Sequence, residues 1–173
     1  MGYFHTRGLR GSLLEEMVNM TNDIYRKKGI ALIQKIPTPI KPVEISKENR
    51  TISLGYFEQK STVDYIGVAQ GIPICFDAKE TSQNSLPLQN IHKHQIEFMQ
   101  DFEKQEGISF ILVYFKKYTK YFILPLEKLK EFYDIKEKGG RKSIPYNEFG
   151  ESLEIKINNF AYINYLEKLN EMM

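Results

Sequence analysis

Apolar residues recur every three or four positions in several segments of the chain, a spacing typical of amphipathic helices. The first such segment runs from Leu13 to Lys28 and is followed by Gly29, a residue type that commonly ends helices. Ser12, with Glu15 three positions later, has the form of a capping box at its start. The same spacing predicts helices over residues 92–104, 126–133 and 162–172.

Between these segments, short apolar or alternating runs predict β-strands. They cover residues 30–33, 64–69, 72–80, 108–115 and 121–124. Gln70 and Gly71 separate the second and third runs, so these two strands are expected to form a hairpin. The polar residues 81–90 and the basic residues 136–143 are expected to be loops. This order of elements predicts a mixed α/β domain with one central sheet.

The stretch from Pro37 to Ser61 differs from its surroundings because it offers few residues to a core. Three prolines near its start interrupt the preceding strand. Apolar and polar residues then alternate in two short runs. The pattern predicts a two-stranded arm at about residues 39–61, which projects from a single domain spanning residues 1–173.

Composition and charge exclude several classes of protein. No apolar run approaches the roughly 18 residues of a membrane span. The single cysteine, Cys75, excludes an internal disulfide and fits a reducing compartment. A soluble cytoplasmic protein without membrane contact is therefore expected. The net charge is only +2, but residues 1–63 carry ten Lys or Arg against six Asp or Glu, which favours an anionic partner on this part of the chain.

Two carboxylates and one ammonium group are expected to share one face of the sheet. Asp77 and Lys79 lie two positions apart in a predicted strand, so both point to the same side, and the hairpin returns Asp64 beside them. Two close carboxylates repel each other, and Mg²⁺ or Mn²⁺ relieves that repulsion. Lys79 would then stabilise charge on a phosphate or hold the attacking water. The alternative is a surface strand whose Asp and Lys merely pair, and by pattern alone that alternative is the commoner one.

Other polar residues near this cluster have structural explanations of their own. Thr62 and Gln95 carry oxygen ligands, but residues of these types are usually caps or surface groups. Glu15 either completes the capping box or reaches the carboxylates from the side of the first helix. His92 and His94, two positions apart on one helix, are expected to face too far apart to bind one metal, so a zinc site is not predicted.

Basic residues gather near the N-terminus, in the arm and in the loop after the third predicted helix. They are Arg7, Arg10, Lys35, Lys41, Lys47, Arg50, Lys60, Arg141 and Lys142. Any one of these runs is typical of a solvated surface. Several of them around a carboxylate site are typical of contacts to the phosphates of DNA.

Short motifs occur in order along most of the chain. They are Arg10-Gly11 with Leu14-Glu15, Lys35-Ile-Pro-Thr-Pro39, Ser61-Thr-Val-Asp64-Tyr, Phe76-Asp-Ala-Lys-Glu-Thr81, Pro87-Leu-Gln-Asn90, His92-Lys-His-Gln95 and Arg141-Lys-Ser-Ile144. Taken together, this set resembles the RecU family of Holliday-junction resolvases. The resemblance implies a restriction-endonuclease-like PD-(D/E)xK core with a protruding stalk. It also implies a homodimer that uses Mg²⁺ to cut four-way DNA junctions in recombination and repair, and the oxygen ligands suit Mn²⁺ as a substitute.

The resemblance also assigns roles to individual residues. By position, Thr62, Asp64, Asp77 and Gln95 would hold the metal, and Lys79 would stabilise the transition state. The arm would be the stalk that enters the centre of the junction. Asp77 stands where family members usually carry Glu, so this ligand is one methylene shorter.

Two alternatives to a junction resolvase remain open at this stage. One is a non-catalytic protein of the same fold that binds junctions and modulates a RecA-type recombinase. The intact set of Asp64, Asp77 and Lys79 favours an enzyme over this alternative. The other is a nuclease of the same fold for linear duplex, which a comparison of the two DNA substrates distinguishes.

Overall fold

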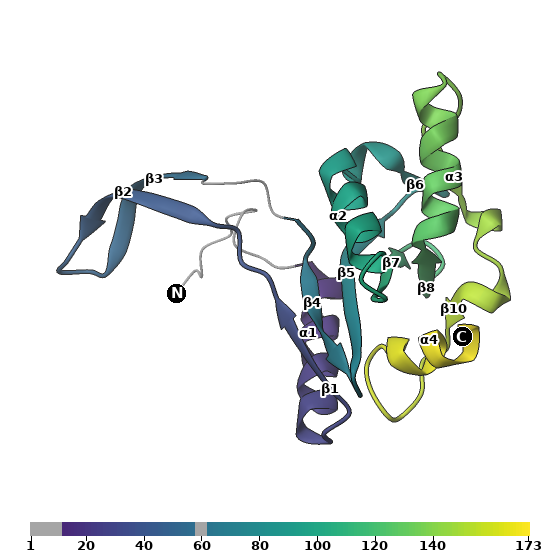
Figure 1. Ribbon diagram of the computed structural model, residues 1–173, viewed down its shortest axis with the longest axis horizontal. Coiled ribbons are helices and arrows are strands. Elements are labelled where there is room, and N and C mark those ends of the chain that lie inside the picture. The colour runs from purple at the N-terminus through teal and green to yellow at the C-terminus, as the bar shows by residue number, and fades with distance from the viewer. Residues whose placement is uncertain (1–11, 58–61) are drawn as a thin grey trace.

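A six-stranded mixed sheet forms the centre of the computed structural model, which describes residues 12–57 and 62–173 (Figure 1). In spatial order the strands are β1 (Ala31–Lys35), β4 (Tyr65–Ala69), β5 (Ile72–Thr81), β7 (Ile108–Phe115), β8 (Lys120–Pro125) and β10 (Glu154–Ile155). β5 and β7 run parallel, and the other neighbouring strands are antiparallel. The predicted hairpin is therefore confirmed as β4 and β5, joined at Gln70 and Gly71, which both have positive φ.

Helices cover both faces of this sheet. The helices α1 (Leu13–Lys27) and α4 (Tyr165–Met172) share one buried apolar cluster with the sheet, and α2 (Lys93–Glu103) and α3 (Leu126–Glu137) share the other. Successive side chains of β5 point to opposite faces of the sheet, so Phe76 joins the cluster with α1 and Cys75 joins the cluster with α2. The sheet is thus buried on both sides, and the mixed α/β class expected from the sequence is confirmed.

Two segments expected to be loops contain regular structure. Ser85–Pro87 (β6) pairs with Ser143–Pro145 (β9), and the register places Leu86 opposite Ile144, both fully buried. α3 extends to Glu137, into the expected basic loop, whereas α4 begins only at Tyr165. Single helical turns occupy Leu88–Asn90, Tyr146–Glu148 and Glu151–Leu153. The β6–β9 pairing joins residues far apart in the chain, so no local pattern indicated it.

The predicted arm is a hairpin of β2 (Ile40–Ser46) and β3 (Thr51–Phe57) that projects away from the sheet (Figure 1). Neither strand has a buried residue. Its large apolar side chains are exposed, with Phe57 reaching 77%. They are Ile40, Val43, Ile45, Ile52, Leu54, Tyr56 and Phe57. The arm therefore contributes nothing to either buried cluster of the described residues.

Within residues 12–57 and 62–173, none of the helices has the length and apolar character needed to cross a membrane.

Candidate active site

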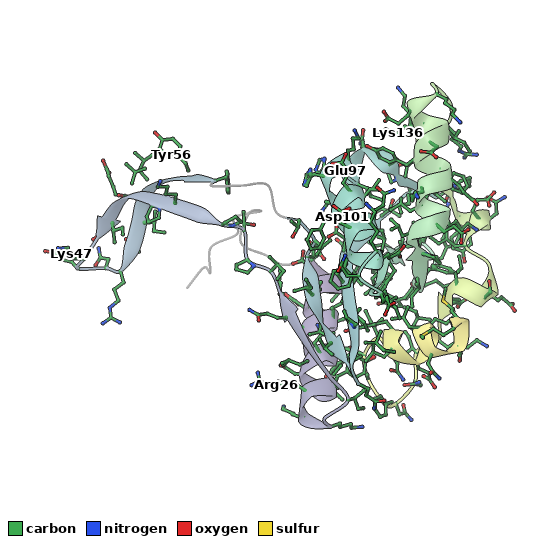
Figure 2. All side chains as sticks on the ribbon, viewed as in Figure 1. Arg26, Lys47, Tyr56, Glu97, Asp101 and Lys136 are labelled. Atoms are coloured by element: carbon green, nitrogen blue, oxygen red, sulfur yellow. The ribbon has the colours of Figure 1, made fainter. Side chains whose placement is uncertain are left out.

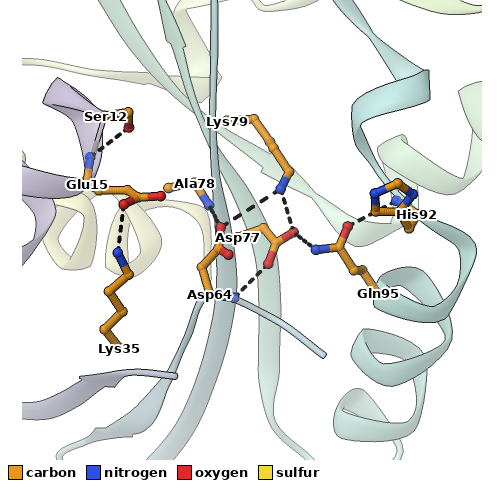
Figure 3. Close-up of polar contacts among 9 residues, drawn as sticks. All are labelled: Ser12, Glu15, Lys35, Asp64, Asp77, Ala78, Lys79, His92 and Gln95. Atoms are coloured by element: carbon orange, nitrogen blue, oxygen red, sulfur yellow. Dashed lines mark hydrogen bonds and ion pairs between the residues drawn. The ribbon is translucent and has the colours of Figure 1, made fainter. Parts of the chain in front are cut away.

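The hairpin of β4 and β5 holds two carboxylates in a reciprocal arrangement. Asp64 directly precedes β4, and its backbone N–H donates to Oδ1 of Asp77 at 2.7 Å (Figure 3). In return, the backbone N–H of Ala78 donates to Oδ2 of Asp64 at 3.0 Å. Each carboxylate is thus fixed by the backbone of the other strand, which sets the separation between them.

Lys79 places its ammonium group against both carboxylates. Its Nζ lies 3.1 Å from Oδ2 of Asp77 and 3.9 Å from Oδ2 of Asp64. Asp77 has no exposed surface, and the Lys79 side chain is 18% exposed. Asp77 and Lys79 therefore share one face of β5, as the alternation predicted, and they meet in a largely desolvated place where charge interactions are strong.

Gln95 connects this cluster to the start of α2. Its Nε2 donates to Oδ2 of Asp77 at 2.5 Å, and its Oε1 accepts from the backbone N–H of His92 at 3.0 Å. The second bond satisfies a donor at the helix start, as a capping residue at the third helical position does. The Gln95 carboxamide thus both caps α2 and presents its NH₂ group to the buried carboxylate.

Burial makes Asp77 an unusually weak acid. Burial is the largest cause that raises its pKa, to about 6, and the neighbouring Asp64 charge raises it further, while Lys79 and the hydrogen bond from the Asp64 backbone lower it. The charged form of Asp77 is therefore costly near neutral pH, and an additional cation beside it would offset that cost.

The donor atoms of this cluster fit a hard divalent cation. Asp64 and Asp77 supply carboxylate oxygens from two adjacent strands. In the described part of the chain, no group of at least three His, Cys, Asp or Glu side chains converges on one point. Mg²⁺ is commonly held by one or two carboxylates and completes its shell with water and substrate phosphate, so two carboxylates suffice.

Thr62 and Glu15 lie at the edges of this cluster. Thr62 is exposed, and none of the hydrogen bonds among the described residues joins it to the carboxylates. The backbone N–H of Glu15 donates to Oγ of Ser12 at 3.2 Å, but the Glu15 carboxylate pairs with Nζ of Lys35 at 2.7 Å. The expected capping box is therefore only half formed, because the lysine at the end of β1 attracts the carboxylate away from the helix start (Figure 3).

The expectation that His92 and His94 face apart is wrong. His92 lies before α2 with an extended backbone, φ −90° and ψ 148°, rather than within the helix. Its ring consequently stacks on that of His94, with centroids 5.4 Å apart and planes 10° apart. Cys75, on the same strand as Asp77, is fully buried, and burial raises its pKa to about 12, so its thiol is no nucleophile near neutral pH.

Comparison with known proteins decides the family. The family model described as "RecU: Recombination protein U" matches residues 9–171. The chain belongs to the RecU family. Three relatives, each named Holliday junction resolvase RecU, come from Pediococcus pentosaceus, Lactococcus lactis subsp. lactis and Streptococcus pneumoniae. They are 44%, 42% and 41% identical over 172, 170 and 167 residues, covering 95%, 95% and 94% of this chain and 86%, 79% and 83% of their own.

One solved structure is also similar to this RecU family member. It is described as Archaeoglobus fulgidus Hjc, a Holliday junction resolvase, and matches with a TM-score of 0.36 and 9% identity over 65% of this chain and 74% of its own. A similarity at that level carries no weight in the assignment. Apart from the arm and β6, the chain order is α1, the antiparallel strands β1, β4 and β5, then α2 and β7, which runs parallel to β5.

The basic residues of this RecU family member lie in two exposed regions. Lys41, Lys47 and Arg50 are exposed on the arm, with Lys47 near its tip (Figure 2). Arg141 and Lys142 are exposed in the loop before β9, and the carbonyl of Lys142 accepts from the backbone N–H of Leu88, just ahead of α2. Lys35 is held by Glu15. Arg7, Arg10 and Lys60 lie outside the described residues.

Sequence reasoning named Gln95 as a capping residue or a metal ligand, but it did not give the two hydrogen bonds that its carboxamide makes. A polar side chain three positions after His92 has the spacing of a capping box, which indicates that Gln95 folds back on the helix start. The resemblance placed Gln95 near Asp77 as a metal ligand, but it did not indicate that the carboxamide donates directly to the Asp77 carboxylate.

The raised pKa of Asp77 makes the stability of this protein dependent on pH. Between its ordinary value of 3.8 and about 6, the folded chain keeps a proton that the unfolded chain has released. The free energy of unfolding is therefore expected to fall as pH rises through this window, by on the order of 3 kcal/mol in total. Urea unfolding of the wild type and of Asp77→Asn in metal-free buffer, from pH 4 to pH 7, isolates this contribution. If the free energies of unfolding of the two proteins differed by the same amount at every pH, the proposed contribution of Asp77 would be contradicted.

Proposed function

We propose that this protein cuts four-way DNA junctions as a metal-dependent endonuclease, with Asp64, Asp77 and Lys79 at the reacting centre. The observation that carries the proposal is the ammonium group of Lys79 lying against two carboxylates that are locked together by backbone hydrogen bonds. Membership of the RecU family, whose relatives are named Holliday junction resolvases, supplies the substrate.

In this proposal, Asp64 and Asp77 hold the cation, and Gln95 lies beside them. A Mg²⁺ or Mn²⁺ ion bound there would polarise the attacking water and share the phosphate charge. Lys79 donates to a non-bridging phosphate oxygen and stabilises the negative charge that develops in the transition state. Asp77 keeps its orientation because the Asp64 backbone and the Gln95 carboxamide both donate to it. The water oxygen bonds to phosphorus, the bond to the 3′ oxygen breaks, and that oxygen takes up a proton, which leaves 5′-phosphate and 3′-hydroxyl ends.

Two edge residues complete the proposed site. Thr62 is exposed two positions before Asp64, so it is accessible to a ligand arriving from solvent. Glu15 is an accessory carboxylate, and its partner Lys35 is itself a proposed phosphate contact. DNA entering the site would therefore compete with Glu15 for the Lys35 ammonium group.

The substrate also implies an assembly. A four-way junction has two-fold symmetry and needs two matched nicks, so a symmetric homodimer suits it. The projecting arm, with Lys41, Lys47 and Arg50 exposed, is proposed to enter the open centre of the junction. Arg141 and Lys142 would hold a phosphate backbone near the start of α2.

The proposed function predicts a defined pattern of cleavage on synthetic DNA. A labelled four-way junction is expected to be nicked with Mg²⁺ or Mn²⁺ and to stay intact with EDTA, while linear duplex of the same sequence is cut far less. Mn²⁺ is expected to support a rate at least equal to that with Mg²⁺. The short Asp77 side chain encloses the ion less tightly than Glu would, and Mg²⁺ is the more demanding in geometry.

Three results would contradict parts of this proposal. Cleavage in EDTA would exclude a required metal. Equal cutting of junction and duplex would indicate a general nuclease. Tight junction binding without nicking under every metal would favour the recombinase modulator instead, and a strong preference for Mg²⁺ would contradict the loosely enclosed ion.

A further inference from the structure

The ammonium group of Lys79 lies in the position that a divalent cation shared by Asp64 and Asp77 would also need. Its Nζ approaches Oδ2 of both carboxylates, at 3.1 Å from Asp77 and 3.9 Å from Asp64, so it lies where the two negative charges converge (Figure 3). A divalent cation shared by these two residues would have to bind the carboxylate oxygens that face Lys79. The ammonium group and the cation therefore compete for the same electrostatic position.

Both oxygens of Asp77 already accept hydrogen bonds. Oδ1 accepts from the Asp64 backbone, while Oδ2 accepts from Gln95 and lies 3.1 Å from the Lys79 ammonium group. Because Asp77 is fully buried, it cannot turn outward to offer new lone pairs. Oδ2 has both of its lone-pair sites engaged, so a cation that binds this oxygen must displace Gln95 or Lys79.

The three donors differ in how easily they move. The Asp64 donor is a backbone N–H at the start of β4, and the Gln95 carboxamide is held at its other end by the His92 backbone. Lys79 carries its charge on a flexible four-carbon stem, and its side chain retains 18% exposure. Lys79 is thus the donor that gives way.

We propose that Lys79 is the counterion of the carboxylate pair until a divalent cation binds, and that it is released to the substrate phosphate only when the cation takes its place. The inference rests on the proposed function, because it assumes that Asp64 and Asp77 bind the ion. It gives Lys79 two opposed effects: it weakens ion binding, and it accelerates the reaction. It also sets an order, in which the lysine is delivered to the phosphate only in a site already loaded with metal.

The burial of Asp77 agrees with this double role. Its carboxylate has no exposed surface, so water cannot solvate the negative charge. A buried carboxylate therefore needs a positive neighbour. Lys79 supplies that neighbour while no ion is bound, and it helps to orient the carboxylate for the ion.

Equilibrium binding of Mn²⁺ alone to the full chain, followed by electron paramagnetic resonance, tests the proposal without any DNA. Lys79→Met removes the charge at nearly constant length and is expected to bind Mn²⁺ roughly tenfold or more tightly than the wild type. Lys79→Arg keeps the charge and should stay within about threefold of the wild type. Lys120→Met is the matched control, since it removes another cation paired with a carboxylate, that of Glu154, outside the proposed site, and it should change the affinity by less than about threefold.

The possible outcomes separate this proposal from the function on which it rests. Wild-type binding with equal or weaker binding by Lys79→Met would overturn the proposal and leave the metal-dependent function standing. No Mn²⁺ binding by any variant would refute both. If Lys79→Met fails to fold, reductive ¹³C-methylation of the wild type replaces it. The Lys79 resonance, assigned by its loss in Lys79→Arg, should shift on saturation with Mg²⁺, and an unshifted resonance would refute the release.

Discussion

Replacing Asp77 by Asn is expected to abolish junction cleavage while leaving junction binding intact. The substitution removes the charge that holds the proposed metal. It also replaces one acceptor oxygen with an NH₂ group, although donors from Asp64 and Gln95 approach both oxygens of Asp77. One donor must then face another, so the new amide loses the fixed orientation of the carboxylate. Lys79→Ala should lower the single-turnover rate by about 10²- to 10³-fold, the usual effect of removing one group that stabilises transition-state charge.

A matched control separates the site from a general change of charge. Asp101→Asn makes the same substitution on an exposed residue of α2, whose side chain is 73% exposed and pairs with Lys104 (Figure 2). It should cut junctions at the wild-type rate. Single-turnover cleavage and gel-shift binding on the same labelled junction provide both readouts. A near wild-type rate for Asp77→Asn would show that the reacting centre lies elsewhere.

Replacing residues 43–55 by a short Gly-Ser turn is expected to leave the fold intact and to weaken junction binding selectively. None of the residues in β2 and β3 is buried, so the two apolar clusters keep all of their members. Junction affinity should fall roughly tenfold or more, because the arm offers cations and apolar surface to the open centre where phosphates converge and bases unstack. Linear duplex offers no such centre, so its affinity should change little.

The salt dependence of binding gives a second readout for the arm. The replacement removes Lys47 and Arg50, so the slope of log affinity against log salt should decrease by roughly two, at about 0.9 per lost phosphate contact. A double substitution, Lys47→Ala with Arg50→Ala, keeps the hairpin and should reproduce the change in slope alone. Equal loss of affinity for junction and duplex after the arm replacement would mean that the arm is a general DNA contact or a dimer element.

The elements nearest the site were the most predictable from the sequence. Alternation along residues 72–80 placed Asp77 and Lys79 on one side of a strand, and the Gln70–Gly71 turn returned the chain so that Asp64 lies beside them. Both inferences depend on residues within a few positions of one another. A strand has a period of two and a tight turn reverses the chain directly, so the local sequence suffices for them.

The pairs that join distant segments were not predictable in the same way. Glu15 was expected to fold back on its own helix, yet it pairs with Lys35, twenty positions away. β6 pairs with β9, although two helices and two strands separate them along the chain. The helix α3 also continues into residues where a loop was expected. In each case a local partner competes with a partner from a distant part of the sequence. The packing of the elements decides which partner lies within reach.

By itself, the sequence determined the mixed α/β class, the carboxylate–lysine cluster on one face of β5, and an arm that offers little to the core. Period, turn chemistry and composition are local properties, and they are sufficient for these features. Only the tertiary structure decided that the Asp77 carboxylate is fully buried, that Gln95 links it to the start of α2, and that Lys79 lies against both carboxylates. The physical reason is that burial and hydrogen-bond geometry arise when helices pack on the sheet, so the acidity of Asp77 depends on neighbours that its own strand does not contain.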